Sequence, residues 1–188
     1  MVEPDVVRTA HRRAAQRLER RHAALLQHPQ FPVHAQSLAL AVGPQLHRDA
    51  GARKVLAKYP GLKLLDHQTA SWGRAKALAL TENWIQAHKG RFSAVFAHND
   101  EMAMGALLAL ERAGLKKDVY VIGIDAIAQA LTAVKEGRLD ATVFQDAVGQ
   151  GKGSVDAALL LAKKQPCPQE TMIPFQLVTR ENLSQFLK

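Results

Sequence analysis

Residues 92–125 read FSAVFAHNDEMAMGALLALERAGLKKDVYVIGID, and this stretch decides the fold. The apolar run at 92–97 predicts a strand, and apolar residues at helical spacing predict a helix over 100–113 that begins after Asn99. The near-continuous apolar run at 119–124 predicts a second strand that is covered on both faces. A strand, a helix and a strand in this order predict a βαβ unit with parallel strands.

The same alternation continues on both sides of this stretch. Upstream, residues 62–66 predict a strand, 67–71 a loop and 73–88 a helix with an apolar stripe. Downstream, alternating segments predict two more helices and two more strands: helices over 127–136 and 148–164, and strands over 139–144 and 173–178. The sequence therefore predicts an α/β fold, a three-layer parallel sheet with helices on both faces.

Composition narrows the classes of protein. The chain has 188 residues, of which 47% are hydrophobic and 22% charged, and this excludes collagen, a coiled coil and wholesale disorder. Its apolar runs are too short to span a membrane. The single Cys167 excludes an internal disulfide, and without Cys/His zinc spacing we predict no metal site and no cofactor. The start, MVEPDVVRTAHRR, lacks the apolar stretch of a secretory signal, so as written the chain would stay in the cytoplasm.

Basic charge is unevenly distributed along the chain. The formal net charge is +8, and residues 1–53 hold eight Arg, no Lys and five of the eight His. A basic helix over 4–26 is the one feature that favours nucleic acid. The segment 28–33 then breaks the chain, where a helix-turn-helix would need a second packed helix. We therefore predict no nucleic-acid partner, and divide the chain into an atypical Arg/His-rich segment 1–47 and a domain 48–188.

Polar residues stand where the predicted strands end. In an open parallel sheet, ligands bind outside the carboxyl ends of the strands. Carboxylates and amides at that edge suit a neutral ligand with many hydroxyl groups, and Trp72 can lie against the C–H face of a sugar ring. The alternative is that Asn99 and Asp125 only cap helices and that Trp72 belongs to the core. Four successive strands carry such a polar residue: Asp66, Asn99, Asp125 and Gln145.

Three blocks of the chain, 96–107, 121–125 and 137–145, have the order and spacing of a known family. They resemble the ribose-binding-protein family of periplasmic sugar-binding proteins, the soluble receptors of ABC importers. The ending at 173–182 also resembles that family's C-terminus. The resemblance implies one lobe of the type I periplasmic binding protein fold over 48–188. The helix and strand near its end would return to a first lobe that we expect this chain to lack.

The resemblance also implies roles for five residues. Asn99 and Asp125 match residues that bind sugar hydroxyls, and Gln145 matches a glutamine on the hinge side of the site. Trp72 matches an aromatic that stacks on the sugar ring, and Arg48 matches a donor to ring oxygens or hydroxyls. The family's Gly-Phe pair after this arginine is Gly-Ala here, and an isoleucine replaces the aromatic often found before the aspartate, so the identity of the sugar stays open.

The function that the resemblance implies is that of a truncated solute-binding component of a sugar ABC importer. Its ligand would be a monosaccharide, a pentose or a hexose, and its partner a membrane permease. The implied location is the periplasm. Because one lobe cannot enclose a sugar, we expect binding to be impaired.

Parts of the sequence are also compatible with two other classes of function. The effector-binding core of LacI-type transcriptional repressors has the same fold and is the alternative, although such repressors carry a helix-turn-helix headpiece that residues 1–47 do not predict. Acidic and histidine residues at 66–67 and 99–101 suggest acid–base chemistry. No nucleophile elbow or Gly-rich phosphate loop accompanies them, so we predict that the protein is not an enzyme.

Overall fold

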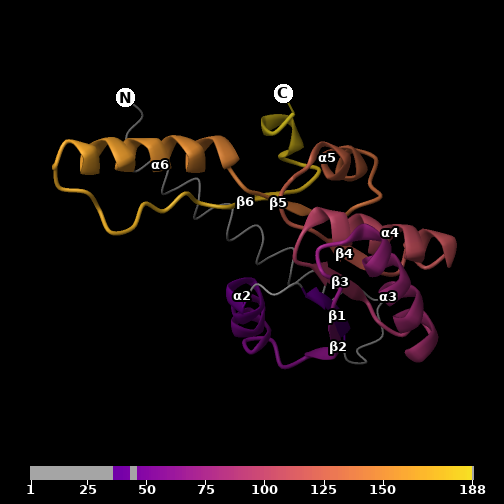
Figure 1. The fold of residues 1–188 in the computed structure, drawn as a ribbon. Helices are drawn as coiled ribbons and strands as arrows, with labels where there is room; N and C mark the ends of the chain where they lie inside the picture. Colours follow the sequence, from indigo (N-terminus) through magenta and orange to yellow (C-terminus); the bar gives the residue numbers. More distant parts are fainter. Residues whose placement is uncertain (1–35, 43–45, 188) are drawn as a thin grey trace. The chain divides into compact units, whose positions relative to one another are not determined.

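The structure is a computed structural model that describes residues 36–42 and 46–187 (Figure 1). Residues 36–188 form a compact unit by themselves. The predicted helix at 4–26 lies outside the described residues. The order of elements is strand, helix, strand throughout most of this unit, and the predicted α/β class is confirmed.

Four parallel strands make the main sheet, in the order β2-β1-β3-β4. A fifth strand, β5, extends the same edge through two isolated parallel bridges, Ile122 to Ala141 and Asp125 to Phe144. With β1 in the interior, the strand order reverses between β1 and β3, which is where ligands bind in open α/β sheets. The strands are β1 (Gln36–Val42), β2 (Leu62–Thr69), β3 (Ala94–Ala97), β4 (Tyr120–Ile122) and β5 (Thr142–Phe144).

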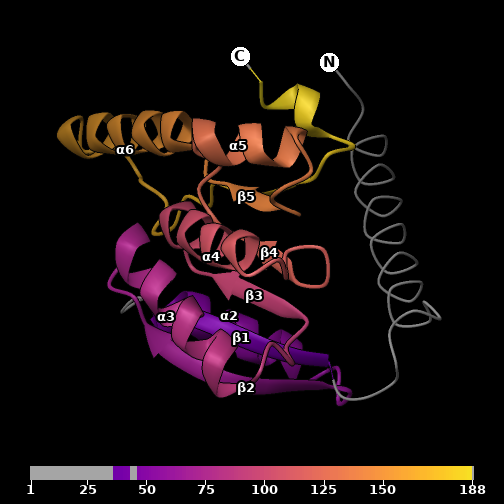
Figure 2. The same cartoon turned by 90° about the vertical axis from the view of Figure 1, so that its right-hand side faces the viewer.

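Helices cover both faces of the sheet, as predicted. Figure 1 shows α2 on the opposite side of β1 and β3 from α3, and Figure 2 shows α3 and α4 side by side along the sheet. The observed bounds lie within a few residues of the predicted ones from α3 onward. The helices are α2 (Leu46–Leu56), α3 (Arg74–Ala87), α4 (Asp100–Arg112), α5 (Ala128–Lys135) and α6 (Ala147–Ala162).

Strand β1 differs from the sequence-based expectation. It lies inside the segment 1–47, which was separated by its composition and in which no strand was expected. Yet β1 pairs with β2 on one side and β3 on the other, so the first strand of the sheet begins at Gln36. The reason is physical: strand formation depends on the local apolar run SLALAV at 37–42, whereas the division at residue 47 followed the Arg/His content around it.

The last strand also differs from the expectation of an all-parallel sheet. Strand β6 (Gln176–Val178) pairs with β5 in antiparallel orientation, with Val143 opposite Leu177. Antiparallel pairing follows because the chain returns to β5 after α6 from the other direction. Helix α6 contains no buried residue, and its Val155 and Leu161 are exposed. Among the described residues, no helix combines the length and apolarity that crossing a bilayer requires.

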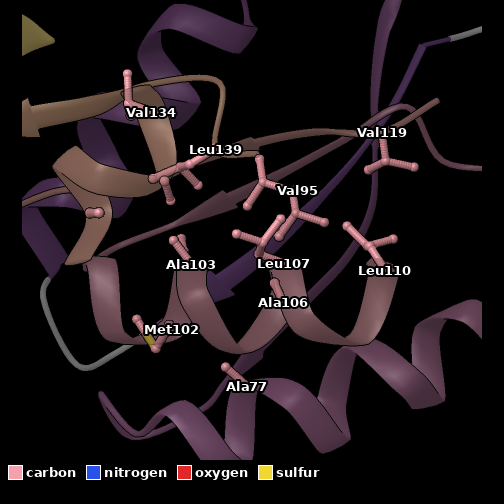
Figure 3. Packing of buried hydrophobic residues seen from close by; sticks show 14 of the residues in the cluster. Ala77, Val95, Met102, Ala103, Ala106, Leu107, Leu110, Val119, Val134 and Leu139 are labelled. Carbon is pink, nitrogen blue, oxygen red and sulfur yellow. The ribbon is translucent and has the colours of Figure 1, made fainter. Parts of the chain in front are cut away.

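The core lies between α4, the sheet and α3. Figure 3 shows Leu107 and Leu110 of α4 near Val95 of the sheet, with Ala77 of α3 pointing toward α4. These four side chains are completely buried. Small residues on the facing surfaces allow α3 and α4 to approach closely, which sets the positions of the loops that precede both helices.

Candidate functional site

Five residues predicted for the site lie at the carboxyl edge of the sheet. Arg48 is in the first turn of α2, and Trp72 lies between β2 and α3. Asn99 follows β3, Asp125 follows β4 and Gln145 follows β5. The topology brings these ends together because the strands of the sheet are parallel.

Arg48 is the centre of this cluster. Its Nη2 donates a hydrogen bond to Oε1 of Gln145 over 2.9 Å and lies 3.6 Å from Oδ1 of Asp125. Its Nη1 donates to the main-chain carbonyl of His98. The Arg48 side chain is only 15% exposed, so these bonds form largely out of water, where charge-assisted bonds are stronger.

Trp72 and Asn99 complete the cluster. The guanidinium carbon of Arg48 lies 5.7 Å from the centroid of the Trp72 ring, within the range of a cation–π contact. The Asn99 amide Nδ2 is 3.4 Å from the main-chain oxygen of Trp72. The structure therefore joins all five predicted residues in one contiguous group: Arg48 contacts three of the others, and Asn99 joins through Trp72.

The helix-capping alternative holds for one residue and not for the other. Asn99 is the N-cap of α4, because its Oδ1 accepts a hydrogen bond from the Met102 N–H over 2.9 Å. Its amide nitrogen still faces Trp72, so capping and site placement coexist. Asp125 is not the N-cap of α5, since that position is Ile127.

Asp66 lies apart from the cluster, although it was grouped with the strand-end residues. Strand β2 continues to Thr69, so Asp66 sits inside the strand rather than at its end. Its carboxylate accepts from Gln68 Nε2 over 3.1 Å and lies 3.4 Å from His88 Nε2. The predicted loop over 67–71 is thus mostly strand.

The backbone of two site loops is strained. Ser71 and Trp72 have φ angles of 49° and 63°, and Asp125 and Ala126 have φ angles of 125° and 59°. Residues other than glycine rarely adopt these angles, and they persist only where surrounding contacts hold them. Such residues cluster at functional sites, and two of these four are predicted site residues.

Asp100 holds the Asp125 loop from beneath, a role that sequence reasoning missed. Its carboxylate is completely buried and accepts from Thr142 Oγ1 over 2.6 Å and from the Ile127 N–H over 2.9 Å. Burial raises the pKa of Asp100, against these hydrogen bonds. Burial also raises the pKa of Asp125, and the guanidinium of Arg48 opposes that rise. Arg48 therefore favours the charged form of a partly desolvated carboxylate at the edge of the sheet.

His98 lies directly beneath the cluster. Its ring is completely buried and stands edge-on to Phe96, with ring centroids 5.4 Å apart. Within the described part of the chain, neither ring nitrogen has a hydrogen-bond partner. Burial lowers the pKa of His98, the charge of Asp49 raises it, and the charge of Arg48 lowers it further. The imidazole is therefore neutral in the folded protein near pH 7.

The buried His98 predicts that acid destabilises the protein. Below about pH 6.5, the ordinary pKa of histidine, the unfolded chain binds a proton that the folded chain does not. The free energy of unfolding should therefore fall as the pH drops from 7 toward 5, by up to about 1.4 kcal/mol per pH unit. Urea unfolding at several pH values measures this slope, and His98→Gln should make it shallower.

Two further groups enter this comparison with the opposite sign. Asp100 and Asp125 have raised pKa values in the folded state, so they lower the free energy of unfolding as the pH rises. Both residues are present in the wild type and in His98→Gln, so their effect is common to the two. His88→Gln is the matched control, because it removes a partly exposed imidazole. Equal slopes for wild type and His98→Gln would contradict the prediction.

The cluster favours binding rather than chemistry on a metal. Across 36–42 and 46–187, no group of three or more His, Cys, Asp or Glu side chains is placed to hold a metal ion. What the site offers is one strong cationic donor, one carboxylate, two amides and an aromatic face. Such groups exchange hydrogen bonds with hydroxyls, since each carboxylate oxygen accepts and each amide both donates and accepts.

Comparison with known proteins decides the family. Residues 36–166 match the family model described as "Periplasmic binding protein domain". The chain belongs to this periplasmic binding protein family. The predicted one-lobe type I fold and the predicted kinship with ribose-binding proteins are both confirmed. The match begins at the first residue of β1, which agrees with the sheet starting upstream of residue 48.

Three curated relatives are similar over part of their length. A Rhizobium meliloti protein with the provisional name rhizopine-binding protein is 51% identical over 127 residues, 67% of this chain and 41% of that protein. The xylitol-binding protein of Mycolicibacterium smegmatis is 34% identical over 139 residues, 74% of this chain and 40% of the relative. The ribose import binding protein of Bacillus subtilis is 38% identical over 120 residues, 64% of this chain and 38% of the relative. The periplasmic binding protein chain thus spans about two fifths of these relatives.

Solved structures give the same result. A solute-binding protein of an ABC transporter from Bacillus halodurans, with bound myo-inositol, superposes with a TM-score of 0.76 at 40% identity. The match covers 89% of this chain and 57% of that one. The ribose import binding protein and the ABC transporter solute-binding protein are named as transport proteins, and the comparisons do not favour the repressor alternative.

Proposed function

We propose that residues 36–187 bind a neutral polyhydroxylated ring, a monosaccharide or a cyclitol, as part of the solute-binding component of an ABC importer. The observation that carries this proposal is the position of Arg48, which contacts Asp125, Gln145 and Trp72 at the carboxyl edge of the sheet, where the strand order reverses. The protein would act in the periplasm and deliver its ligand to a membrane permease. Importer names among the relatives support that assignment.

Each residue has a distinct task in this proposal. The Asp125 carboxylate accepts hydrogen bonds from adjacent hydroxyls, and Arg48 donates to a hydroxyl or ring oxygen. Asn99 Nδ2 and Gln145 Oε1, whose present contacts are to protein groups, add a donor and an acceptor. Trp72 covers the C–H face of the ring.

The charges within the cluster indicate which class of ligand it would bind. The Asp125 carboxylate is already balanced by the guanidinium of Arg48, so the cluster favours a ligand without net charge. The names and titles of similar proteins point the same way: they include ribose, xylitol and myo-inositol, all of which are neutral and polyhydroxylated. Because myo-inositol is bound in the 40% identical structure, we expect it to bind at least as well as a pentose.

Binding by this chain alone should be weak. The five residues lie on one edge of one sheet, so water competes for every hydroxyl of a bound ring. We expect a Kd on the order of 1 mM or weaker, which corresponds to about −4 kcal/mol. Impairment of this kind is part of the proposal.

A titration tests this proposal. Full-length protein labelled with ¹⁵N should show saturable shifts of the Asn99 and Gln145 side-chain amides on addition of myo-inositol, ribose, xylitol or a hexose. Glycine and glutamate serve as controls that carry charge. Saturation by an amino acid without saturation by any polyol would overturn the assignment.

A chimera raises the affinity into a convenient range. Joining the first lobe of the 51% identical relative to residues 36–188 should tighten polyol binding by about 100-fold or more, because closure excludes water from the site. Calorimetry on the chimera then ranks the polyols. A folded chimera that binds none of them would contradict the proposed function.

A further inference from the structure

Arg74 contacts two other residues, Glu101 and Gln129, through its guanidinium group. Its Nε donates to Glu101 Oε2 over 3.0 Å and its Nη2 to Glu101 Oε1 over 2.9 Å, a bidentate pair. The same Nη2 donates to Gln129 Oε1 over 2.6 Å. One guanidinium therefore links the first turns of α3, α4 and α5.

Each of these three helix starts follows a loop that carries a predicted site residue. Arg74 is two residues after Trp72, and Glu101 is two residues after Asn99. Gln129 is four residues after Asp125. The contacts of Arg74 thus fix the distances among three loops that reach the site from separate strands.

The loops need such a link because their backbone is strained. Trp72 and Asp125 have positive φ angles, and contacts must hold them there. The Asp125 loop has a buried tie, through the bond from the Ile127 N–H to Asp100. The Trp72 loop has its own contacts, which include the Gly73 N–H bond to Ala70, the Ser71 N–H bond to Thr69 Oγ1 and the cation–π contact with Arg48. Its direct bond to the start of α4 is the weak 3.4 Å bond from Asn99, so the bidentate pair of Arg74 with Glu101 is the stronger side-chain link between the two.

We propose that Arg74 is a positioning residue that holds Trp72, Asn99 and Asp125 in binding geometry by tying α3 to α4 and α5. The inference rests on the proposed function, since it assigns the residue that preorganises the same site. Preorganisation raises affinity because the loops no longer pay for ordering when the ligand binds. Arg74 itself contacts no ligand in this proposal.

Arg138 provides a matched control, because its partner also lies on α4. It forms a bidentate pair with Glu111, near the other end of α4, over 2.8 and 3.1 Å, and it also reaches Glu136 over 3.2 Å. Arg74 and Arg138 are similarly exposed, at 37% and 45%. Removing either one loses a comparable surface pair, so the effect on stability should be alike and small.

The experiment compares Arg74→Met, Glu101→Gln and Arg138→Met in the full chain. We expect Arg74→Met to weaken polyol binding about five- to tenfold, Glu101→Gln to do so by a smaller factor, and Arg138→Met to leave Kd unchanged. Hydrogen exchange gives a readout that needs no ligand. The Gly73 amide should exchange several-fold faster in Arg74→Met and at the wild-type rate in Arg138→Met.

Each result bears on the proposal. If polyol binding and Gly73 exchange are the same in Arg74→Met as in Arg138→Met, the proposal is overturned. If wild-type protein binds none of the polyols, the proposed function fails, and Arg74 is judged by exchange alone: faster exchange at Gly73 supports the tie, and an unchanged rate refutes it. If Arg74→Met does not fold, Glu101→Gln replaces it in both measurements.

Discussion

Replacing Gly105 with alanine should destabilise the domain by about 3 kcal/mol, because the added methyl group has no space. A Cβ at this position would lie 2.2 Å from the main-chain oxygen of Arg74, 3.0 Å from the Leu78 nitrogen and 3.1 Å from the Ala77 Cβ. The nearest two of these atoms belong to the backbone of α3, which cannot rotate away. Helices α3 and α4 would have to separate.

A second glycine within a helix isolates this steric effect. A Cβ on Gly151 of α6 would meet nothing within 4 Å, so Gly151→Ala gains helix propensity without a clash and should stabilise by up to about 1 kcal/mol. Urea unfolding of both variants gives the two free energies. A Gly105→Ala protein as stable as Gly151→Ala would show that α3 and α4 do not pack as closely as described.

This close packing could not be predicted from the sequence. The pattern in 92–125 predicted α4 and its neighbouring strands because apolar periodicity is local. What Gly105 contacts depends on how α3 crosses α4, which is a property of the tertiary structure. Strand β1 was missed for a different reason, since a short apolar run gave less signal than the Arg/His-rich composition around it.

The site was predictable to a similar degree. Asn99, Asp125 and Gln145 were predicted because strand ends of a parallel sheet meet at one edge, and Trp72 because it follows the first of these strands. Arg48 was predicted only through a resemblance. Residues that support the site from behind were not found. Acidic residues are common in the first turn of a helix, where Asp100 stands, yet its carboxylate turns inward to Thr142, and no sequence pattern distinguishes these two orientations.

A related limit concerns Arg74 and His98. A single arginine at the start of a helix and a single histidine at the end of a strand have no distinctive spacing. Their importance comes from contacts across the chain, such as the 27-residue separation between Arg74 and Glu101. The one usable signal was proximity in sequence, because each lies within two residues of a predicted site residue.

Replacing Asp125 with asparagine should remove polyol binding while leaving the fold intact. In the proposed function this carboxylate accepts hydrogen bonds from ligand hydroxyls, and a hydrogen bond to a charged group contributes about 1.5–3 kcal/mol. Losing this acceptor and the charge that balances Arg48 should raise Kd by about 100-fold. The titration with myo-inositol or ribose should then show no saturation in the full chain, and in the two-lobe chimera a Kd about 100-fold weaker than without the substitution.

The free energy of unfolding should change by less than about 1 kcal/mol, and this separates a binding role from a structural one. Burial already disfavours the charged form of Asp125, as its raised pKa indicates, so a neutral amide of the same shape offsets the loss of the 3.6 Å contact with Arg48. Asp118→Asn is the matched control, because it removes one negative charge from an exposed position. Unchanged titration by Asp125→Asn, or equal weakening by Asp118→Asn, would show that binding depends on net charge or on another part of the chain, and that the Asp125 carboxylate does not contact the ligand.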